Sequence, residues 1–337
     1  MSLKEFFFKI SFLYRFLPLT FLMRLSGKKI ILPFYHFVIE KENSLVNHLY
    51  QPKTKEQFVE DITFFKKHLI SLPVSHLKKK KDTTILGFII SFDDGLSNFN
   101  HIVAPILIKE KVYAINFLNT NFIDNKKLFY RYKVNLLIDF IENNTLSTDQ
   151  QLGTKELLNI DSFNFPLIVE KLKSLTIKNE GLIDELAKIL NFSFVDFLQN
   201  KKPYLSKEQV LDLKKKDFLF GAHSENHPRY SLIPLDKQLE ETLNSLRTLQ
   251  NEFSIQENYF SFPFSDDGVS NDFFEKLKTE DIITFGTSGL KDEGLKNHYQ
   301  RIPMEYDKVY SAETIVKGEL IYYLLKKKFG KHRITRN

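Results

Sequence analysis

The feature that most constrains the fold is an alternation of short apolar runs with amphipathic stretches. Residues 54–69 (TKEQFVEDITFFKKHL) place Phe58, Ile62, Phe65 and Leu69 three and four positions apart, which is the spacing of a helix with one buried face. The apolar runs resemble strands that are buried on both faces. We expect strands at 29–37, 85–92, 112–118, 217–223, 258–264 and 282–288. This order of strands and helices predicts a parallel sheet covered by helices.

The pattern changes between residues 126 and 203, where strand-like runs stop and helical periods dominate. We interpret this region as a mostly helical insertion, which either covers a site or docks a partner. The alternation of helices and strands resumes at residues 206–216, where Ser206 and Gln209 have the spacing of a capping box.

Composition excludes several classes of site. The 337 residues are 42% hydrophobic and 27% charged, as in globular proteins, and none is cysteine. A disulfide framework, a thiolate metal site and a cysteine nucleophile are therefore excluded. The net charge of +6 is modest, and lysine runs such as LKKKK at 77–81 are typical of a solvated surface. No nucleic-acid-binding signature accompanies them, so we expect no nucleic-acid partner.

The first 28 residues are apolar but are interrupted by Lys9, Arg15 and Arg24. No small-residue cleavage site follows, and the run is short for a membrane span. We expect one N-terminal helix, which either packs on the domain or lies on a membrane surface. A basic tail at 326–337 also follows an apolar stretch. The predicted location is the cytoplasm, with peripheral membrane association through the N-terminal helix left open.

Two polar motifs follow predicted strands. Asp93 and Asp94 lie in SFDDG, which taken alone is typical of a turn. His223 and His227 lie in HSENHP, where Pro228 stops the backbone from continuing as a long helix. Because the carboxyl ends of parallel strands converge on one face, these motifs are expected to meet there. One carboxylate and two imidazoles suit Zn²⁺, Fe²⁺ or Co²⁺, and the other aspartate is free to act as a base.

These motifs resemble those of the polysaccharide deacetylases, also called the NodB homology or carbohydrate esterase family 4 group. The resemblance covers roughly residues 29–125 and 203–305. It implies a distorted, incomplete TIM-like (β/α) barrel carrying the helical insertion. It also implies Asp93 as catalytic base, Asp94, His223 and His227 as metal ligands, and Ser224 as a loop-stabilising hydroxyl.

The third motif of the family is matched less closely by FSFPF (260–264). Pro263 and Phe264 fit, and the resemblance implies that the Phe264 backbone N–H faces the oxyanion. Ser261 stands where many members have an arginine that supports the catalytic aspartate. Arg301, in QRIP, fits the closing strand, where a structural role is equally compatible. The SDDG sequence at 265–268 is expected to form a turn.

The general acid is not identified by the sequence. The tryptophan of the fourth family motif is missing, because the chain has no tryptophan, and the fifth motif, which supplies a histidine, is not clear. His298 lies in a predicted loop outside that motif and is not assigned. His36 lies in the first predicted strand, where we favour a hydrogen-bonded core histidine over a site residue.

The resemblance implies a metal-dependent deacetylase that hydrolyses the N-acetyl group of an amino sugar, with a metal-bound water as nucleophile and Asp93 as general base. Zn²⁺ is the expected metal, with Co²⁺, Ni²⁺, Fe²⁺ and Mn²⁺ as alternatives. The expected partner is an acetylated carbohydrate, with a lipid- or nucleotide-linked precursor favoured. A catalytically decayed glycan-binding relative, or a deacylase of O-acetyl or small non-sugar amide substrates, remains open. The domains expected are 1–28, an N-terminal helix; 29–125 and 204–325, two parts of a deacetylase barrel; 126–203, the insertion; and 326–337, the tail.

Overall fold

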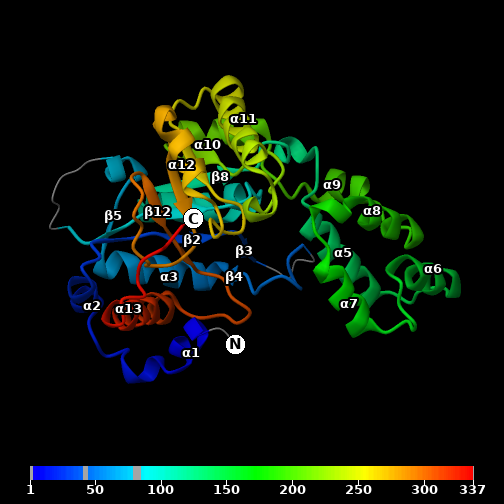
Figure 1. Ribbon diagram of the computed structural model, residues 1–337, viewed down its shortest axis with the longest axis horizontal. Coiled ribbons are helices and arrows are strands. Elements are labelled where there is room, and N and C mark those ends of the chain that lie inside the picture. Colours follow the sequence, from blue (N-terminus) through cyan, green and yellow to red (C-terminus); the bar gives the residue numbers. More distant parts are fainter. Residues whose placement is uncertain (1–2, 41–44, 79–84, 337) are drawn as a thin grey trace.

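The computed structural model describes residues 3–40, 45–78 and 85–336. Most of the lysine run at 77–81 lies outside these residues. The core is a ring of parallel strands with helices on its outside, and a group of helices extends from one side of it (Figure 1). The distorted barrel predicted from the sequence is therefore present.

The barrel sheet has eight parallel strands in the order β12-β11-β10-β9-β8-β7-β2-β13. The strands β12 and β13 are separated in the chain by Arg301 alone. Because β12 pairs with β11 and β13 pairs with β2, residues 298–303 close the ring. The strand bounds are β2 (Pro33–Tyr35), β7 (Ile90–Phe92), β8 (Ala114–Leu118), β9 (Leu219–Ala222), β10 (Tyr259–Ser261), β11 (Ile283–Gly286), β12 (His298–Gln300) and β13 (Ile302–Pro303).

Two smaller parallel sheets lie beside the ring. The first has the order β1-β6-β5 and the second pairs β3 with β4. Their bounds are β1 (Ile30–Ile31), β3 (Val38–Ile39), β4 (Lys53–Thr54), β5 (Ile70–Ser71) and β6 (Gly87–Phe88). The predicted strands 29–37 and 85–92 are thus each divided into two short strands.

Helices cover the outside of the barrel and bury their apolar faces against it. The predicted helix at 54–69 is α3 (Lys55–His68), whose N-terminus has a Thr54–Gln57 capping box. The capping box predicted at Ser206 and Gln209 begins α10 (Lys207–Lys215). The other outer helices are α4 (Ala104–Glu110), preceded by a π-helical turn at Phe99–Val103, α11 (Leu235–Phe253), α12 (Asn271–Leu277) and α13 (Ala312–Lys328).

The N-terminal segment is not the single helix expected for residues 1–28. It forms α1 (Leu3–Lys9), a 3₁₀ turn at Ser11–Leu13 and α2 (Leu19–Ser26). Pro18 precedes α2 in an extended conformation, and a helix running through it would lose a backbone hydrogen bond. Among the described residues, no helix is both long enough and apolar enough to cross a bilayer.

Residues 130–201 form five helices beside the barrel (Figure 1). Their buried side chains form a hydrophobic cluster that also includes Leu96 and Tyr204 of the barrel loops. The helical group is therefore packed onto the mouth of the barrel. The helices are α5 (Tyr130–Asn143), α6 (Thr148–Leu158), α7 (Phe165–Ser174), α8 (Glu180–Ile189) and α9 (Phe194–Lys201).

Candidate active site

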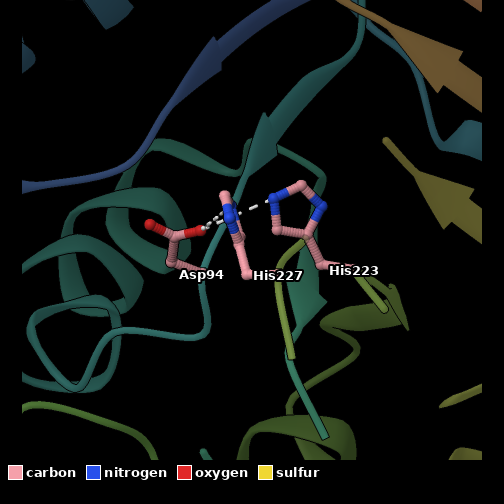
Figure 2. A group of neighbouring side chains, drawn as sticks. All are labelled: Asp94, His223 and His227. Carbon is pink, nitrogen blue, oxygen red and sulfur yellow. Dashed lines mark ion pairs between the residues drawn. The ribbon is translucent and has the colours of Figure 1, made fainter. Parts of the chain in front are cut away.

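Asp94, His223 and His227 meet at the carboxyl ends of the barrel strands (Figure 2). Asp94 follows β7, and both histidines follow β9. One ligand atom from each residue lies within 4.8 Å of the others, and all three side chains are buried. The Asp94 Oδ1 atom lies 3.2 Å from His227 Nε2 and 3.5 Å from His223 Nε2.

The donor atoms fit a divalent metal. Asp94 Oδ1 is buried and has no hydrogen-bond partner within the described residues, so the oxygen is left for a cation. His223 Nδ1 lies 2.8 Å from the Ser261 carbonyl oxygen, which leaves Nε2 to face the other ligands. Burial lowers the pKa of His223 to about 4, so its ring is neutral at pH 7 and can coordinate a metal.

The loops that carry these ligands have unusual backbone conformations. Asp94, Ser224 and His227 all have positive φ angles, of 71°, 66° and 56°. Side chains other than glycine seldom adopt this region, and such strain is concentrated at functional sites. The Ser224 hydroxyl accepts a hydrogen bond from the His227 N–H at 2.9 Å, which holds the turn between the two histidines.

Asp93 is held by Arg301 across the barrel. The Arg301 guanidinium donates to both carboxylate oxygens of Asp93, at 2.8 and 2.7 Å, and both side chains are almost fully buried. Ser261 Oγ also donates to Asp93 Oδ2, at 3.3 Å. Arg301 therefore contacts Asp93 in the way expected of the arginine that the sequence lacks at position 261. It reaches the site from the break between β12 and β13.

The charges around Asp93 keep it ionised. Burial on its own would raise the pKa of this carboxyl, but the charge and hydrogen bonds of Arg301, together with the nearby His223 and His36, outweigh burial and lower the pKa below its ordinary value. Asp93 Oδ2 lies 4.0 Å from His223 Nε2, next to the candidate metal site. A carboxylate in this place can accept a proton from a water held between the two groups.

The loop after β10 carries Pro263 and Phe264, and Phe264 lines the same pocket as the three candidate ligands. Phe264 has a φ angle of 60°, and its ring contacts His227 with 4.8 Å between the ring centres. Within the described residues, no acceptor bonds to the Phe264 N–H. This N–H is therefore available to an oxyanion.

The helical insertion supplies site residues that the sequence did not indicate. The Tyr132 hydroxyl of α5 donates to Asp94 Oδ2 at 2.5 Å and orients this ligand. The Phe129 ring packs on His227, with 4.3 Å between the ring centres. Helical periodicity marks both positions only as buried, and Tyr132 can be assigned a role only once Asp94 is seen beside it.

His36 lines the pocket instead of being enclosed in the core. The pocket has a volume of about 220 Å³, and Asp93, Asp94, His223 and His227 also line it. His36 Nδ1 lies 2.7 Å from Glu305 Oε2. Burial on its own would lower the pKa of His36, but the charge and hydrogen bond of Glu305, together with the charges of Asp94 and Asp93, raise it to about 9. His36 is therefore protonated at neutral pH and accessible from the pocket.

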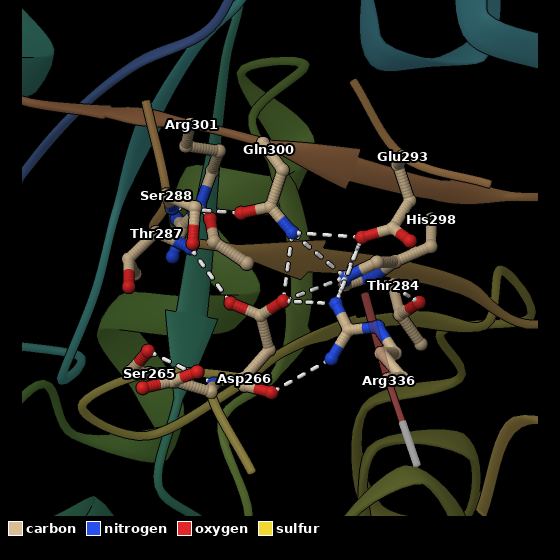
Figure 3. A network of polar contacts seen from close by, with 12 residues as sticks. Ser265, Asp266, Thr284, Thr287, Ser288, Glu293, His298, Gln300, Arg301 and Arg336 are labelled. Atoms are coloured by element: carbon tan, nitrogen blue, oxygen red, sulfur yellow. Dashed lines mark hydrogen bonds and ion pairs between the residues drawn. The ribbon is translucent and has the colours of Figure 1, made fainter. Parts of the chain in front are cut away.

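Asp266 anchors the loop that carries Phe264. The side chain of Asp266 is buried among His298, Gln300 and Arg336 (Figure 3). Its Oδ1 accepts a hydrogen bond from the Thr287 N–H at 3.2 Å, and the Thr287 hydroxyl donates to the Phe264 carbonyl at 3.2 Å. The predicted turn at 265–268 is thus also a buried attachment point.

Asp266, Glu293 and His298 have a geometry that could suit a second metal. However, the Arg336 guanidinium already contacts all three, including Glu293 Oε2 at 2.8 Å. The cationic position is occupied by the arginine, so we assign this cluster to structure (Figure 3).

A basic pocket of about 370 Å³ adjoins the site. Arg131 lines both pockets, and the guanidinium groups of Arg131 and Arg229 lie 5.5 and 5.0 Å from the Phe264 ring centre. Lys173 and Lys178 complete its charged lining, which contains no carboxylate. Among the described residues, none of these four cations has an ion-pair partner.

Comparison with known proteins identifies the family. The sequence profile of the polysaccharide deacetylase family matches residues 80–279. The chain belongs to this family. No curated protein sequence matches it significantly.

Solved structures share the fold. Deacetylase PplD of Streptococcus pyogenes, in complex with acetate, is 14% identical with a TM-score of 0.52, and the match covers 86% of this chain and 98% of that one. IcaB of Ammonifex degensii is 12% identical with a TM-score of 0.52, covering 87% and 97%. The polysaccharide deacetylase BC0361 of Bacillus cereus is 11% identical with a TM-score of 0.52, covering 86% and 69%. At these identities the likeness establishes the barrel fold.

Proposed function

We propose that this polysaccharide deacetylase is a metal-dependent enzyme that removes the N-acetyl group from an amino sugar. The observation that carries the proposal is the adjacent placement of two chemically different groups. Asp93, paired with Arg301, lies beside the Asp94–His223–His227 ligand set. Amide hydrolysis needs a base and an electrophilic metal close enough to act on the same water molecule.

Asp94, His223 and His227 would hold the metal, with Zn²⁺ as the best match to two imidazoles and one carboxylate. When bound, a metal here would polarise the acetyl carbonyl and favour deprotonation of water. Tyr132 would fix Asp94, and the Ser261 carbonyl would fix the His223 ring. Such supporting contacts commonly change metal affinity by about 10- to 100-fold.

Asp93 would take the proton from the attacking water, since its lowered pKa keeps it ionised and Arg301 holds its carboxylate in one orientation. The Phe264 N–H would donate to the oxygen that becomes negative. One donor of this kind is typically worth about 3 kcal/mol of barrier. The Asp266 attachment keeps the loop that carries this N–H in place.

His36 would donate a proton to the leaving amine. It is protonated at neutral pH, is oriented by Glu305 and lines the same pocket as Asp93. A His36→Gln variant should lose activity on sugar amides, whose amine is a poor leaving group. It should retain much more activity on an aryl acetate, whose leaving group needs no proton. Equal losses on both substrates would exclude this role.

The basic pocket supports a lipid- or nucleotide-linked glycan precursor as the substrate. Phosphate groups in such a linkage would meet Arg131, Lys173, Lys178 and Arg229 while the sugar occupies the catalytic pocket. A neutral wall polymer would leave these cations unpaired.

Acetate release tests the proposed function. The metal-loaded protein should release acetate from N-acetylated oligosaccharides or sugar phosphates, and Asp93→Asn should be slower by about 10²- to 10⁴-fold. Equal rates for the two proteins would favour a decayed glycan-binding relative. The missing arginine at position 261 no longer supports that alternative, because Arg301 makes the contact to Asp93 instead. Release from O-acetyl esters or small amides alone would favour the other deacylase assignments.

A further inference from the structure

The N-terminal segment, residues 3–26, is a fixed part of the protein surface. Phe8, Tyr14, Leu22 and Met23 are all buried. The Lys317 ammonium of α13 donates to a backbone carbonyl of the segment, that of Arg15. The segment therefore keeps one defined face turned outward.

That outward face is also apolar. We name it the apolar ridge, and it consists of Phe12, Leu13, Phe16, Phe21 and Leu25. Phe16 is 74% exposed and Phe12 is 65% exposed. Single exposed hydrophobic residues are normal, but several large ones on one short segment mark an interaction surface.

The charged residues at positions 6–29 are all basic. Lys9, Arg15 and Arg24 are exposed, and residues 6–29 contain no aspartate or glutamate. The end of α13 extends this surface, because the Lys327 ammonium donates to the Ser26 carbonyl at 3.2 Å. Phe329 is 69% exposed there, and residues 320–337 likewise contain no acidic residue.

In Figure 1, α1 lies on the side of α13 that faces away from α3, and α2 lies beside one end of α13. We propose that this surface docks the protein on an anionic phospholipid bilayer, with the apolar ridge in the interfacial layer and the basic residues on the lipid phosphates. Aromatic and aliphatic side chains flanked by lysine and arginine are the pattern of helices that lie in a membrane interface.

A second copy of this chain fits the surface less well. A symmetric dimer through the ridge would bring the same basic residues of both subunits together, and neither residues 6–29 nor residues 320–337 contain a carboxylate side chain to pair with them. An anionic bilayer satisfies both the apolar and the basic side chains. The inference is independent of catalysis, since no residue of the ridge lines the catalytic pocket.

The test is sedimentation of the full chain with vesicles of phosphatidylcholine, with and without phosphatidylglycerol. The wild type should bind the anionic vesicles, and added salt should weaken the binding. The ridge variant Phe12→Ser/Leu13→Ser/Phe16→Ser should bind at least about 100-fold more weakly. An Arg15→Gln/Arg24→Gln variant should lose about fivefold per charge at low salt.

The matched control replaces exposed apolar residues elsewhere, as Ile108→Ser/Leu152→Ser/Val195→Ser. This variant should bind vesicles like the wild type, and thermal unfolding should verify that all proteins are folded. Absence of wild-type binding, or equal binding by the ridge and control variants, would overturn the proposal. A dimer in solution that the ridge variant converts to monomer, without any vesicle binding, would assign the surface to a second copy instead.

Discussion

Replacing Arg301 with methionine should destabilise the protein and impair its base. Arg301 is fully buried, and two of its nitrogens donate to Asp93, which is itself only 2% exposed. Methionine fills part of the space but leaves the Asp93 charge without its partner. Removing one member of a buried ion pair costs about 3–5 kcal/mol. For a chain of this size, this corresponds to a decrease in Tm of about 4–7 °C.

The same substitution should change the pH profile of acetate release. In the wild type the lowered pKa of Asp93 means that its contribution to stability is complete above about pH 4 and is lost as the pH falls through the folded-state pKa. Without Arg301, burial raises the pKa of Asp93. The base is then protonated at higher pH, so the acidic limb of kcat/KM should move to higher pH.

The matched control is Lys53→Met, which breaks another buried pair. Lys53 Nζ lies 2.9 Å from Asp61 Oδ2, both side chains are 2% exposed, and neither residue lines the catalytic pocket. This variant should lose comparable stability in a denaturant titration but keep the wild-type pH profile. The reasoning is refuted if Arg301→Met retains the wild-type acidic limb, or if both variants shift it equally.

Three further substitutions test other parts of the site. Tyr132→Phe should weaken Zn²⁺ binding by about 10-fold in a chelator competition, because Asp94 loses its orienting hydrogen bond; unchanged affinity would contradict this role. Lys173→Glu should raise KM for a phosphate-linked acetylated sugar, whereas Lys171→Glu, on the same helix but outside the basic pocket, should not; equal effects would argue against an anion site. Asp266→Asn should reduce the loss of folding stability that the protein shows in acid. The partners of Asp266 lower its pKa, so its contribution to stability is present above about pH 4 and disappears as the pH falls. If the free energy of unfolding of the variant depends on pH as in the wild type, this role is contradicted.

The barrel could be predicted because its strands and helices follow local patterns. Strands buried on both faces give continuous apolar runs, and α3 shows a clear helical period. The N-terminal segment was predicted wrongly as one helix, since apolar residues occur on both of its faces and hide the breaks. The apolar ridge is recognised only when the inward residues are known.

The candidate metal ligands could be proposed from sequence because each motif directly follows a strand. The contacts of Asp93 could not be predicted from the sequence, because Arg301 lies 208 residues away in the chain. Arg301 reaches Asp93 only when residues 298–303 close the ring. Tyr132 belongs to the insertion and shows only a helical pattern. His36 was read as a core residue, because a strand pattern does not show that its far end opens into a pocket.

The central claim is tested most directly by metal content. Wild type, His223→Ala and Glu293→Gln would be equilibrated with Zn²⁺, desalted and analysed by elemental analysis. The account predicts about one metal ion per chain in the wild type and in Glu293→Gln, whose cluster is occupied by Arg336, and almost none in His223→Ala. A wild type without metal, or a His223→Ala variant that binds as much as the wild type, would contradict it.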